Sequence, residues 1–237
     1  ESGCGKTTTG RAILRLIEPT SGSVVFNGID ITSLEKNKLR IMREKMQIIF
    51  QDPYSSLDPR MSVASIIAEP LIIHKRVSGK KELLKQVQKL MEMVELEDRL
   101  SSSYPHELDG GRRQRIGIAR ALALEPQFIV CDEPVSSLDV SVQAQILNLM
   151  QDLQDRLGLT YMFVTHDMAV VKHISDEIAV MYLGQIIELS PAKDLFAHQY
   201  HPYSHALISA IPKIESKTDE TMTILKGEIG SPIEPKP

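Results

Sequence analysis

Glu1-Ser-Gly-Cys-Gly-Lys6-Thr7-Thr8 opens the chain, and this stretch decides the fold. It fits the phosphate-binding pattern G-x-x-x-x-G-K-[ST] from the second position of the pattern onward, with Gly5, Lys6 and Thr7 closing the motif. The leading glycine of the pattern would precede Glu1, so we expect the printed chain to begin inside a folded domain. The alternative is a glycine-rich turn before an ordinary helix, but Gly-Lys-Thr-Thr at a helix start is a narrow match to the motif.

The chemistry of this loop predicts binding of a nucleoside triphosphate. Glycines at positions 3 and 5 allow backbone angles that turn N–H groups toward phosphate oxygens. A helix expected over residues 7–16 adds partial positive charge at its start. Lys6 supplies a cation for the outer phosphates, Thr7 supplies a hydroxyl for Mg²⁺, and Cys4 is expected to fill space in the loop. The nucleotide-binding residues predicted here are Ser2, Gly3, Cys4, Gly5, Lys6, Thr7 and Thr8.

Composition excludes several classes of protein. The chain has 237 residues, of which 42% are hydrophobic and 24% charged, which suits one large α/β domain with an appendage. A net charge of −4 gives no electrostatic case for a nucleic-acid partner. Cys4 and Cys131 lie far apart, which indicates neither a disulfide framework nor a zinc site and fits a reducing, cytosolic setting. The most apolar stretch, Val63–Ile73, is too short and too interrupted to span a membrane.

Hydrophobic patterning predicts strands that alternate with helices. Short apolar runs typical of strands are Val24–Phe26, Met46–Phe50, Phe128–Cys131 and Tyr161–Val164. Residues 52–104 have helical periodicity and look like an insert between strands, with Leu83, Leu84, Val87, Leu90, Met91 and Val94 on one apolar face. A helix is expected over 143–157, a hairpin over 177–189 turning at Leu183-Gly184, and an extended tail over 216–237. This order predicts a mostly parallel sheet with right-handed crossovers.

Two carboxylates follow the third apolar run, in the stretch Phe128-Ile-Val-Cys-Asp132-Glu133-Pro134. Asp132 is placed to hold Mg²⁺, directly or through water, and Glu133 to accept a proton from an attacking water. A solvated acidic strand end is the alternative. We favour the catalytic interpretation, because an Asp-Glu pair after a buried strand has a specific role in a phosphate-loop protein.

Further motifs make the chain resemble the ATP-binding cassette (ABC) ATPases. They are the glutamine of the Q-loop (Gln51), the signature-motif glycines (Gly110 and Gly111) with Asp109 before them, the D-loop (Ser137–Asp139) and the switch histidine (His166). The resemblance implies a P-loop NTPase core of the ABC type that binds ATP and Mg²⁺. It implies catalytic roles for Glu133, His166 and Lys6, metal binding by Thr7, Gln51 and Asp132, and nucleotide contacts from Gln51, Asp109, Gly110 and Gly111.

The resemblance also implies a domain division. Residues 1–51 and 119–190 would form the RecA-like core, with its early strands missing from the printed chain. Residues 52–118 would form a helical subdomain that carries the signature motif. Residues 191–237 would form a C-terminal extension.

A finer resemblance is to the importer branch for oligopeptides, dipeptides and nickel. It rests on Gln51-Asp-Pro-Tyr-Ser-Ser-Leu-Asp-Pro-Arg60, Glu133-Pro-Val-Ser-Ser-Leu-Asp-Val-Ser141 and His201-Pro-Tyr-Ser-His-Ala-Leu207. It implies an ATP-hydrolysing subunit at the cytoplasmic face of the cell membrane. The implied partners are a second ABC ATPase subunit, two transmembrane permease subunits, whose contact is expected near residues 52–73, and an extracellular substrate-binding protein. The sequence leaves the transported substrate open.

Three histidines in the C-terminal region raise the question of a metal site. His201 and His205 lie one helical turn apart and His198 is close by in sequence. No acidic or cysteine partner accompanies them, so we expect no metal there.

The signature departs from the family's pattern at two positions, where Asp109 replaces serine and Arg112 replaces glutamine. In the family, the signature of one cassette faces the nucleotide of the other, and its serine donates to the γ-phosphate. An ionised Asp109 cannot donate. It either weakens that site or caps the following helix, where acidic residues are favoured, and Arg112 could offset its charge.

These departures lead to a hypothesis about dimerisation. In a heterodimer with a normal-signature cassette, the site built on this chain's phosphate loop should be the stronger hydrolase. Two alternatives remain: a catalytically weak or regulatory cassette, supported by Asp109 alone, and a soluble ABC ATPase without a transport role.

Overall fold

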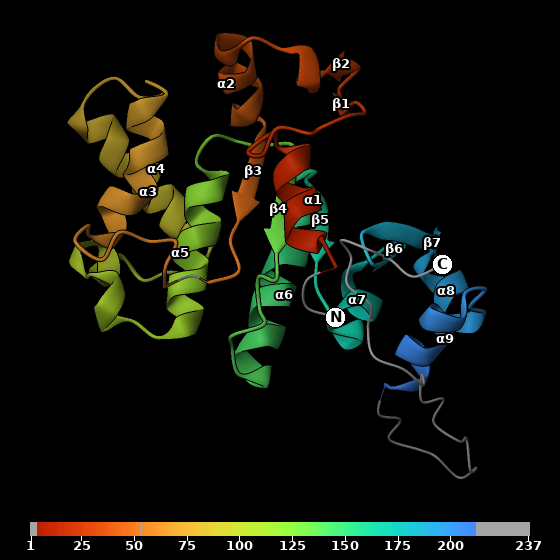
Figure 1. Cartoon of the computed structure of the whole chain (residues 1–237). Helices are drawn as coiled ribbons and strands as arrows, with labels where there is room; N and C mark the ends of the chain where they lie inside the picture. Colours follow the sequence, from red (N-terminus) through yellow and green to blue (C-terminus); the bar gives the residue numbers. More distant parts are fainter. Residues whose placement is uncertain (1–3, 53, 212–237) are drawn as a thin grey trace. The chain divides into compact units, whose positions relative to one another are not determined.

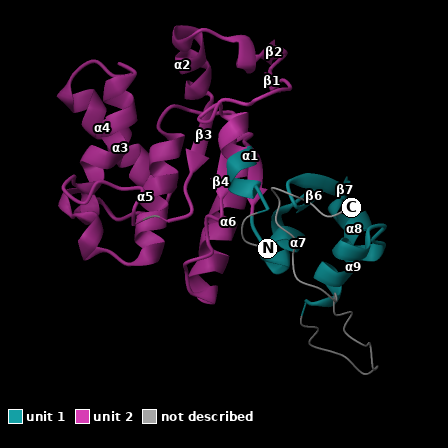
Figure 2. Cartoon of the chain, in the orientation of Figure 1, with its two compact units in different colours: residues 1–9, 165–237 teal, residues 10–164 magenta. Residues whose placement is uncertain are grey.

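The computed structural model describes residues 4–52 and 54–211. The chain divides into two compact units, one made of residues 10–164 and the other of residues 1–9 and 165–237 (Figure 2). The boundary falls inside helix α1 (Lys6–Ile13). The four-part domain division expected from the sequence remains a prediction.

A parallel three-stranded sheet lies at the centre of the unit formed by residues 10–164. Its order is β3-β4-β5, with β3 at Met46–Ile49, β4 at Phe128–Asp132 and β5 at Thr160–Val164. Nearly all of β4 is buried, as expected for the middle strand of a sheet covered on both faces. The parallel pairing and the three strand positions agree with the sequence prediction within a residue.

Gly10 brings α1 close to this sheet. A Cβ at this position would lie 2.8 Å from Cγ1 of Val130, so only a glycine allows the helix to approach β4 this closely. The core around it contains Leu14, Ile31, Leu39, Met46 and Val130.

A short hairpin follows α1, formed by β1 (Val25–Phe26) and β2 (Ile29–Asp30). Its two turn residues, Asn27 and Gly28, have φ of 50° and 77°. Positive φ at both positions is typical of the type I′ turn, whose twist matches that of a hairpin. The chain continues through the 3₁₀ helix η1 (Ile31–Ser33) into α2 (Lys36–Glu44).

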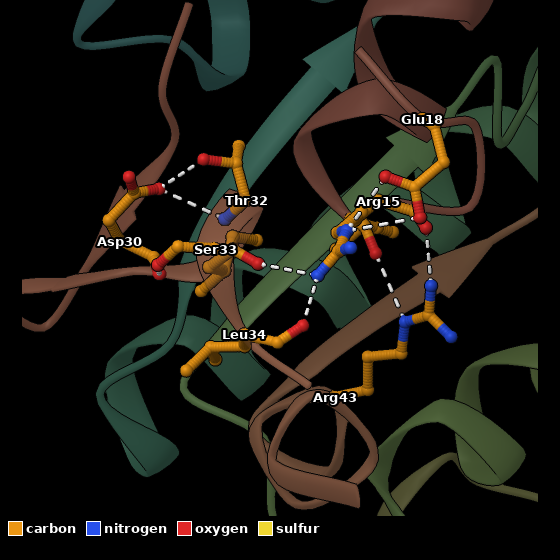
Figure 3. A network of polar contacts seen from close by, with 9 residues as sticks. Arg15, Glu18, Asp30, Thr32, Ser33, Leu34 and Arg43 are labelled. Carbon is orange, nitrogen blue, oxygen red and sulfur yellow. Dashed lines mark hydrogen bonds and ion pairs between the residues drawn. The ribbon is translucent and has the colours of Figure 1, made fainter. Parts of the chain in front are cut away.

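Two arginines form hydrogen bonds around the end of α1 (Figure 3). Arg15 Nη1 donates to the main-chain oxygens of Ile31 at 3.1 Å and Leu34 at 2.5 Å. Arg43 donates to the main-chain oxygen of Leu14 at 3.1 Å and to that of Arg15. Arg43 thus satisfies the carbonyls of the two residues that follow α1, where a helix end leaves such groups without partners. Arg15 joins the same end of the helix to η1 and its cap residue. Burial lowers the pKa of Arg43, and the charge of Arg15 acts in the same direction.

This network explains why α1 is shorter than predicted. The sequence suggested a helix to residue 16, but α1 ends at Ile13. Arg15 has a φ of 52°, in the left-handed region, which stops helical hydrogen bonding just before it.

The helical insert lies between β3 and β4 in the sequence. Its elements are α3 (Val63–Ile73), α4 (Lys80–Met93), η2 (Asp98–Ser102), η3 (Pro105–Glu107) and α5 (Gly110–Leu122). Helix α5 contacts α3 and α4, and also contacts β3 (Figure 1). The predicted apolar face of α4 is buried at Val87, Leu90, Met91 and Val94, whereas Leu84 is exposed.

Helix α6 (Val140–Leu157) returns the chain toward β5. It ends at Gly158 in the left-handed conformation, with φ 66°, as predicted. It begins three residues earlier than the sequence suggested.

The unit formed by residues 1–9 and 165–237 contains a second small core. Helix α7 (Met168–Ile174) precedes an antiparallel hairpin of β6 (Glu177–Tyr182) and β7 (Gln185–Pro191), which turns at Leu183-Gly184 as predicted. Helices α8 (Ala192–Ala197) and α9 (Pro202–Ser209) follow. The core residues are Ile178, Val180, Ala192, Leu195 and Tyr203. The predicted tail over 216–237 lies outside the described residues.

Within residues 4–52 and 54–211, none of the helices has both the length and the apolar character needed to span a bilayer.

Candidate nucleotide-binding and catalytic site

The phosphate loop turns directly into α1. Gly5 has a φ of 96°, and its carbonyl accepts from the backbone N–H of Thr9 at 2.9 Å and from its hydroxyl at 3.0 Å. Lys6 Nζ lies 3.1 Å from Sγ of the buried Cys4. Gly5 thus adopts a backbone conformation that favours glycine, and the phosphate-binding role of the loop stays a prediction. Ser2 and Gly3 lie outside the described residues, and Thr7 and Thr8 fall in the first turn of α1.

The β6–β7 turn lies directly behind this loop. The backbone N–H of Gly184 donates to the carbonyl of Cys4 at 3.1 Å. A Cβ at Gly5 would lie 3.9 Å from Cε of Met181, which is ordinary van der Waals contact. This contact could not be predicted from the sequence, since a hairpin and a loop so far apart in the chain share no motif.

His166 lies between β5 and α7 and is exposed. Its neighbours are both engaged in local hydrogen bonds. Asp167 caps α7 by accepting from the N–H groups of Ala169 at 2.8 Å and Val170 at 3.3 Å, while its own N–H donates to Thr165 Oγ1 at 3.0 Å. The backbone on the C-terminal side of the histidine is therefore held in place by the cap.

The two carboxylates at the end of β4 have different environments. Asp132 ends the strand and is 2% exposed. Glu133 is half-buried and has a φ of 47°, an unusual conformation for a residue other than glycine. Its N–H donates to the carbonyl of Val164 at 2.8 Å. Backbone outliers of this kind are concentrated at functional sites, where the surrounding structure enforces them.

Gln51 contacts Glu133 directly. Its Nε2 donates to Oε2 of Glu133 at 2.9 Å, across the ends of the neighbouring strands β3 and β4. A hydrogen bond from a neutral amide to a carboxylate orients the acid without neutralising it. The structure therefore brings together two residues that the sequence suggested for the same site.

Asp109 caps α5. Its Oδ1 accepts the backbone N–H of Arg112 at 2.8 Å, and its Oδ2 lies 3.2 Å from Nη1 of the same residue. The side chain is 61% exposed. The sequence suggested that Asp109 could cap the helix and that Arg112 could offset its charge. Both contacts are present in the structure.

The two glycines after Asp109 occupy tight positions. A Cβ at Gly110 would lie 2.8 Å from Cδ2 of Leu138, and a Cβ at Gly111 would lie 2.7 Å from Cγ1 of Val142. Of these two contacts, the one at Gly111 favours glycine more strongly, because the side chain of Val142 is stiff whereas the terminal methyl of Leu138 can shift. Both contacts show that the start of α5 packs against the D-loop and the first turn of α6.

One histidine of the C-terminal region, His201, has a structural role. His201 Nδ1 accepts the backbone N–H of Tyr203 at 3.1 Å and so caps α9. The carboxylate of Glu188 accepts the N–H groups of Tyr200 at 3.1 Å and His201 at 3.2 Å. Within the described residues, no group of three or more acidic, histidine or cysteine side chains is placed to hold a metal ion.

The sequence did not single out two arginines of α5, Arg113 and Arg120, which contact Tyr54 and Ser56 in the segment that follows Gln51. The spacing of the arginines by two helical turns was the signal that could have drawn attention to them.

Comparison with known proteins places these features in a family. Residues 1–136 match the family model described as ABC transporter, and residues 187–237 match the model described as oligopeptide/dipeptide transporter, C-terminal region. A relative in Brucella ovis, named as a peptide import ATP-binding protein, is 52% identical over 99% of this chain and 74% of its own length. The oligopeptide transport ATP-binding protein OppF of Bacillus subtilis is 56% identical over 90% of this chain and 70% of its own.

Solved structures show the same similarity. A dimeric, post-hydrolysis state of the ATP-binding cassette MJ0796, bound to ADP and Pi, has a TM-score of 0.73 and 31% identity, covering 81% of this chain and 82% of that one. The structure of cbiO1 from Clostridium perfringens, part of the ABC transporter complex cbiONQ, has a TM-score of 0.75 and 28% identity, covering 84% and 77%.

Proposed function

The chain belongs to the ABC transporter family, and we propose that it is the ATP-hydrolysing subunit that powers a peptide importer. The observation that carries the proposal is the 52% identity, over nearly the whole chain, to a peptide import ATP-binding protein. The match of residues 187–237 to a transporter's C-terminal region favours a transport role over a soluble, non-transport ATPase. We place it at the cytoplasmic face of the membrane, bound through permease subunits.

The residue roles follow from the family's motifs and fit the local geometry. Glu133 would take a proton from the attacking water, with Gln51 orienting its carboxylate through the 2.9 Å hydrogen bond. Lys6 would stabilise charge on the outer phosphates, and His166 would contact the γ-phosphate. The glycine geometry at Gly5 supports phosphate binding by backbone N–H groups.

Mg²⁺ suits the residues that we propose for it. Thr7 offers a hydroxyl, Asp132 a buried carboxylate, and Gln51 an amide whose nitrogen is engaged with Glu133, which leaves its oxygen as the atom that suits a cation. Oxygen ligands are those that Mg²⁺ prefers. When bound, the ion supplies positive charge that bridges phosphate oxygens and offsets their developing charge.

The second cassette in the assembly is, in our proposal, a different chain. Asp109 has its Oδ1 committed to a helix cap and its Oδ2 paired with Arg112, and a carboxylate cannot donate to a phosphate as serine does. A homodimer would carry Asp109 at both ATP sites. A heterodimer with a normal-signature partner would leave the site on this chain's phosphate loop complete.

A groove on the helical insert is the proposed contact with the permease subunits. It has a volume of about 340 Å³ and lies between α3 and α4. Its lining includes Met61, Ala68, Ile72, Leu83, Leu84 and Val87. Ile72 and Leu84 are both more than half exposed, so an apolar partner helix would cover surface that water otherwise contacts. The sequence pointed to residues 52–73, and the groove extends that region to α4.

Hydrolysis by the assembled transporter tests the proposal. We expect Glu133→Gln to lower ATP turnover by about 100-fold or more, because a general base of this kind contributes about 10²–10⁴-fold. ATP hydrolysis and peptide uptake would be measured in proteoliposomes that contain both cassettes, both permeases and the binding protein. Glu125→Gln, a substitution of an exposed acid before β4, is the matched control.

A regulatory cassette is the second candidate, and Asp109 favours it. Near-normal turnover by Glu133→Gln would support this candidate, because hydrolysis would then occur at the partner's site. Failure of the wild-type assembly to couple hydrolysis to peptide uptake would count against both transport roles.

A further inference from the structure

Residues 54–56, which follow Gln51 closely in the chain, form a turn. Asp52 Oδ1 accepts the backbone N–H of Tyr54 at 2.8 Å, and the Asp52 carbonyl accepts that of Ser56 at 3.2 Å. Hydrogen bonding to Tyr54 lowers the pKa of Asp52. Leu57 is buried and anchors the segment. No regular helix or strand is present in the described part of this stretch before α3, so its shape depends on these contacts and on its neighbours.

Arg120 of α5 binds the main chain of this segment. Its Nη1 donates to the carbonyl of Ser56 at 2.6 Å. Burial lowers the pKa of Arg120, with the charge of Glu69 acting in the opposite direction, but a guanidinium remains charged in proteins. A charged donor that is largely removed from water forms a strong hydrogen bond with a carbonyl.

Arg113 of α5 binds the same segment through a side chain. Its guanidinium carbon lies 4.8 Å from the centre of the Tyr54 ring, within the range of a cation–π contact. Its Nε donates to the carbonyl of Pro105 at 2.7 Å, which fixes the guanidinium over the ring. Tyr54 is 58% exposed, so this contact lies at the surface.

Both arginines project from one side of α5, since they are separated by two helical turns. The same helix begins at Gly110 and Gly111, next to the Asp109 cap. Helix α5 therefore carries the signature glycines at its start, and two of its arginine side chains contact the segment after Gln51.

We infer that Arg113 and Arg120 are positioning residues that fix Gln51 against Glu133 by holding the following segment on α5. This inference rests on the proposed function only for the roles of Gln51 and Glu133 in hydrolysis. A displacement of the start of α5 would then reach the hydrogen bond on Glu133 through residues 52–57. The two ends of this path are the proposed signature contact and the proposed catalytic acid of the same chain.

Hydrogen exchange on the full-length protein tests the structural half of the inference. Arg120→Met should raise amide exchange of a peptide covering residues 52–60 by about tenfold or more, because its anchoring hydrogen bond is lost. Arg115 is the matched control on the same helix, since its Nη1 donates to the carbonyl of Val94 at 2.8 Å. Arg115→Met should raise exchange near residues 94–97 and leave 52–60 unchanged. Equal effects of both variants on residues 52–60, or no effect of Arg120→Met, would overturn the inference.

Steady-state kinetics of the assembled transporter test the functional half. Arg120→Met should lower kcat about 5- to 20-fold with KM for ATP within about twofold, because phosphate binding does not depend on it. In a double-mutant cycle, adding Arg120→Met to Gln51→Ala should lower kcat by less than about twofold more. For Arg115→Met combined with Gln51→Ala, the fold changes in kcat of the two single variants should instead multiply. Multiplicative loss for Arg120→Met with Gln51→Ala would show that the arginine does not act through the glutamine.

Tyr54 supplies a second variant in case Arg120→Met does not fold. Tyr54→Leu removes the ring at an exposed position and should repeat the kcat loss at a smaller scale, whereas Tyr54→Phe keeps the ring and should restore the wild-type value. Equal behaviour of the two variants would contradict the role of the Arg113 contact. The exchange experiment needs no ATP turnover, so a failure of the proposed transport function would leave its result interpretable.

Discussion

Two acidic positions in the same unit, one at the end of β4 and one at the start of α5, contrast in burial and in partners. Asp132 is 2% exposed, and the adjacent Glu133 is held by Gln51 and by a strained backbone. Asp109 is 61% exposed and bonds only to groups that its own helix supplies, among the contacts described for it. The first position depends on distant parts of the chain, whereas the second contacts Arg112, three residues further along the same helix. A local cap tolerates substitution more easily than a buried strand end does.

We expect the strongest effect from a substitution at the buried position, Asp132. Asp132→Asn keeps the size of the side chain but removes its charge, so we expect ATP turnover to fall by about 10²–10³-fold. The Mg²⁺ concentration needed for half-maximal turnover should rise as well. Turnover would be measured against Mg²⁺ concentration in the assembled transporter. An unchanged Mg²⁺ requirement would remove Asp132 from the proposed metal ligands.

A medium effect is expected where α5 begins. Gly111→Ala would place a Cβ 2.7 Å from the stiff side chain of Val142, so the free energy of unfolding should fall by about 1–3 kcal/mol. Gly117→Ala is the matched control on the same helix, because a Cβ there meets no atom within 4 Å. That variant should be more stable than wild type by about 0.5–1 kcal/mol. Chemical denaturation of both variants checks the opposite signs.

We expect the weakest effect from substitutions at the exposed position, Asp109. Asp109→Ala removes the cap and should lower the free energy of unfolding by about 1 kcal/mol, whereas Asp109→Ser and Asp109→Asn should stay within about 0.5 kcal/mol of wild type. In the heterodimer, Asp109→Ser should raise turnover at the partner's ATP site, because it restores a donor. To isolate the partner's site, turnover would be measured with Glu133→Gln in this chain and with the partner's general base intact. If Asp109→Ser leaves this turnover unchanged, Asp109 does not impair the partner's site.

The sequence was sufficient to predict those features whose pattern lies within a single segment of the chain. The apolar run before Asp132 predicted a buried strand, and Gly158 predicted the end of α6. The phosphate loop was evident because its chemistry is local to a few consecutive residues. Asp109 was foreseen as a possible cap for the same reason, since a cap involves only the next helical turn.

Features that depend on tertiary placement could not be read from the sequence. The hydrogen bond from Gln51 to Glu133 requires two strands to be neighbours, and the turn after α1 requires Arg43 of α2 to reach the carbonyls of Leu14 and Arg15. The contact of Arg120 with Ser56 joins a helix to an irregular segment that has no periodicity of its own. The residues were visible in each case, but only the fold specifies which partner each one meets.

The hydrogen bond from Gly184 to the carbonyl of Cys4 has a consequence for biosynthesis. The phosphate loop emerges from the ribosome early, yet the hairpin turn that supports it is made near the end of the described chain. At translation rates of roughly 5–20 residues per second, the loop waits on the order of ten seconds or more for this partner. During that interval the nascent loop lacks the support that the turn gives it. A premature stop before the β6–β7 turn would therefore leave the nucleotide site incomplete even though its motif had been translated in full.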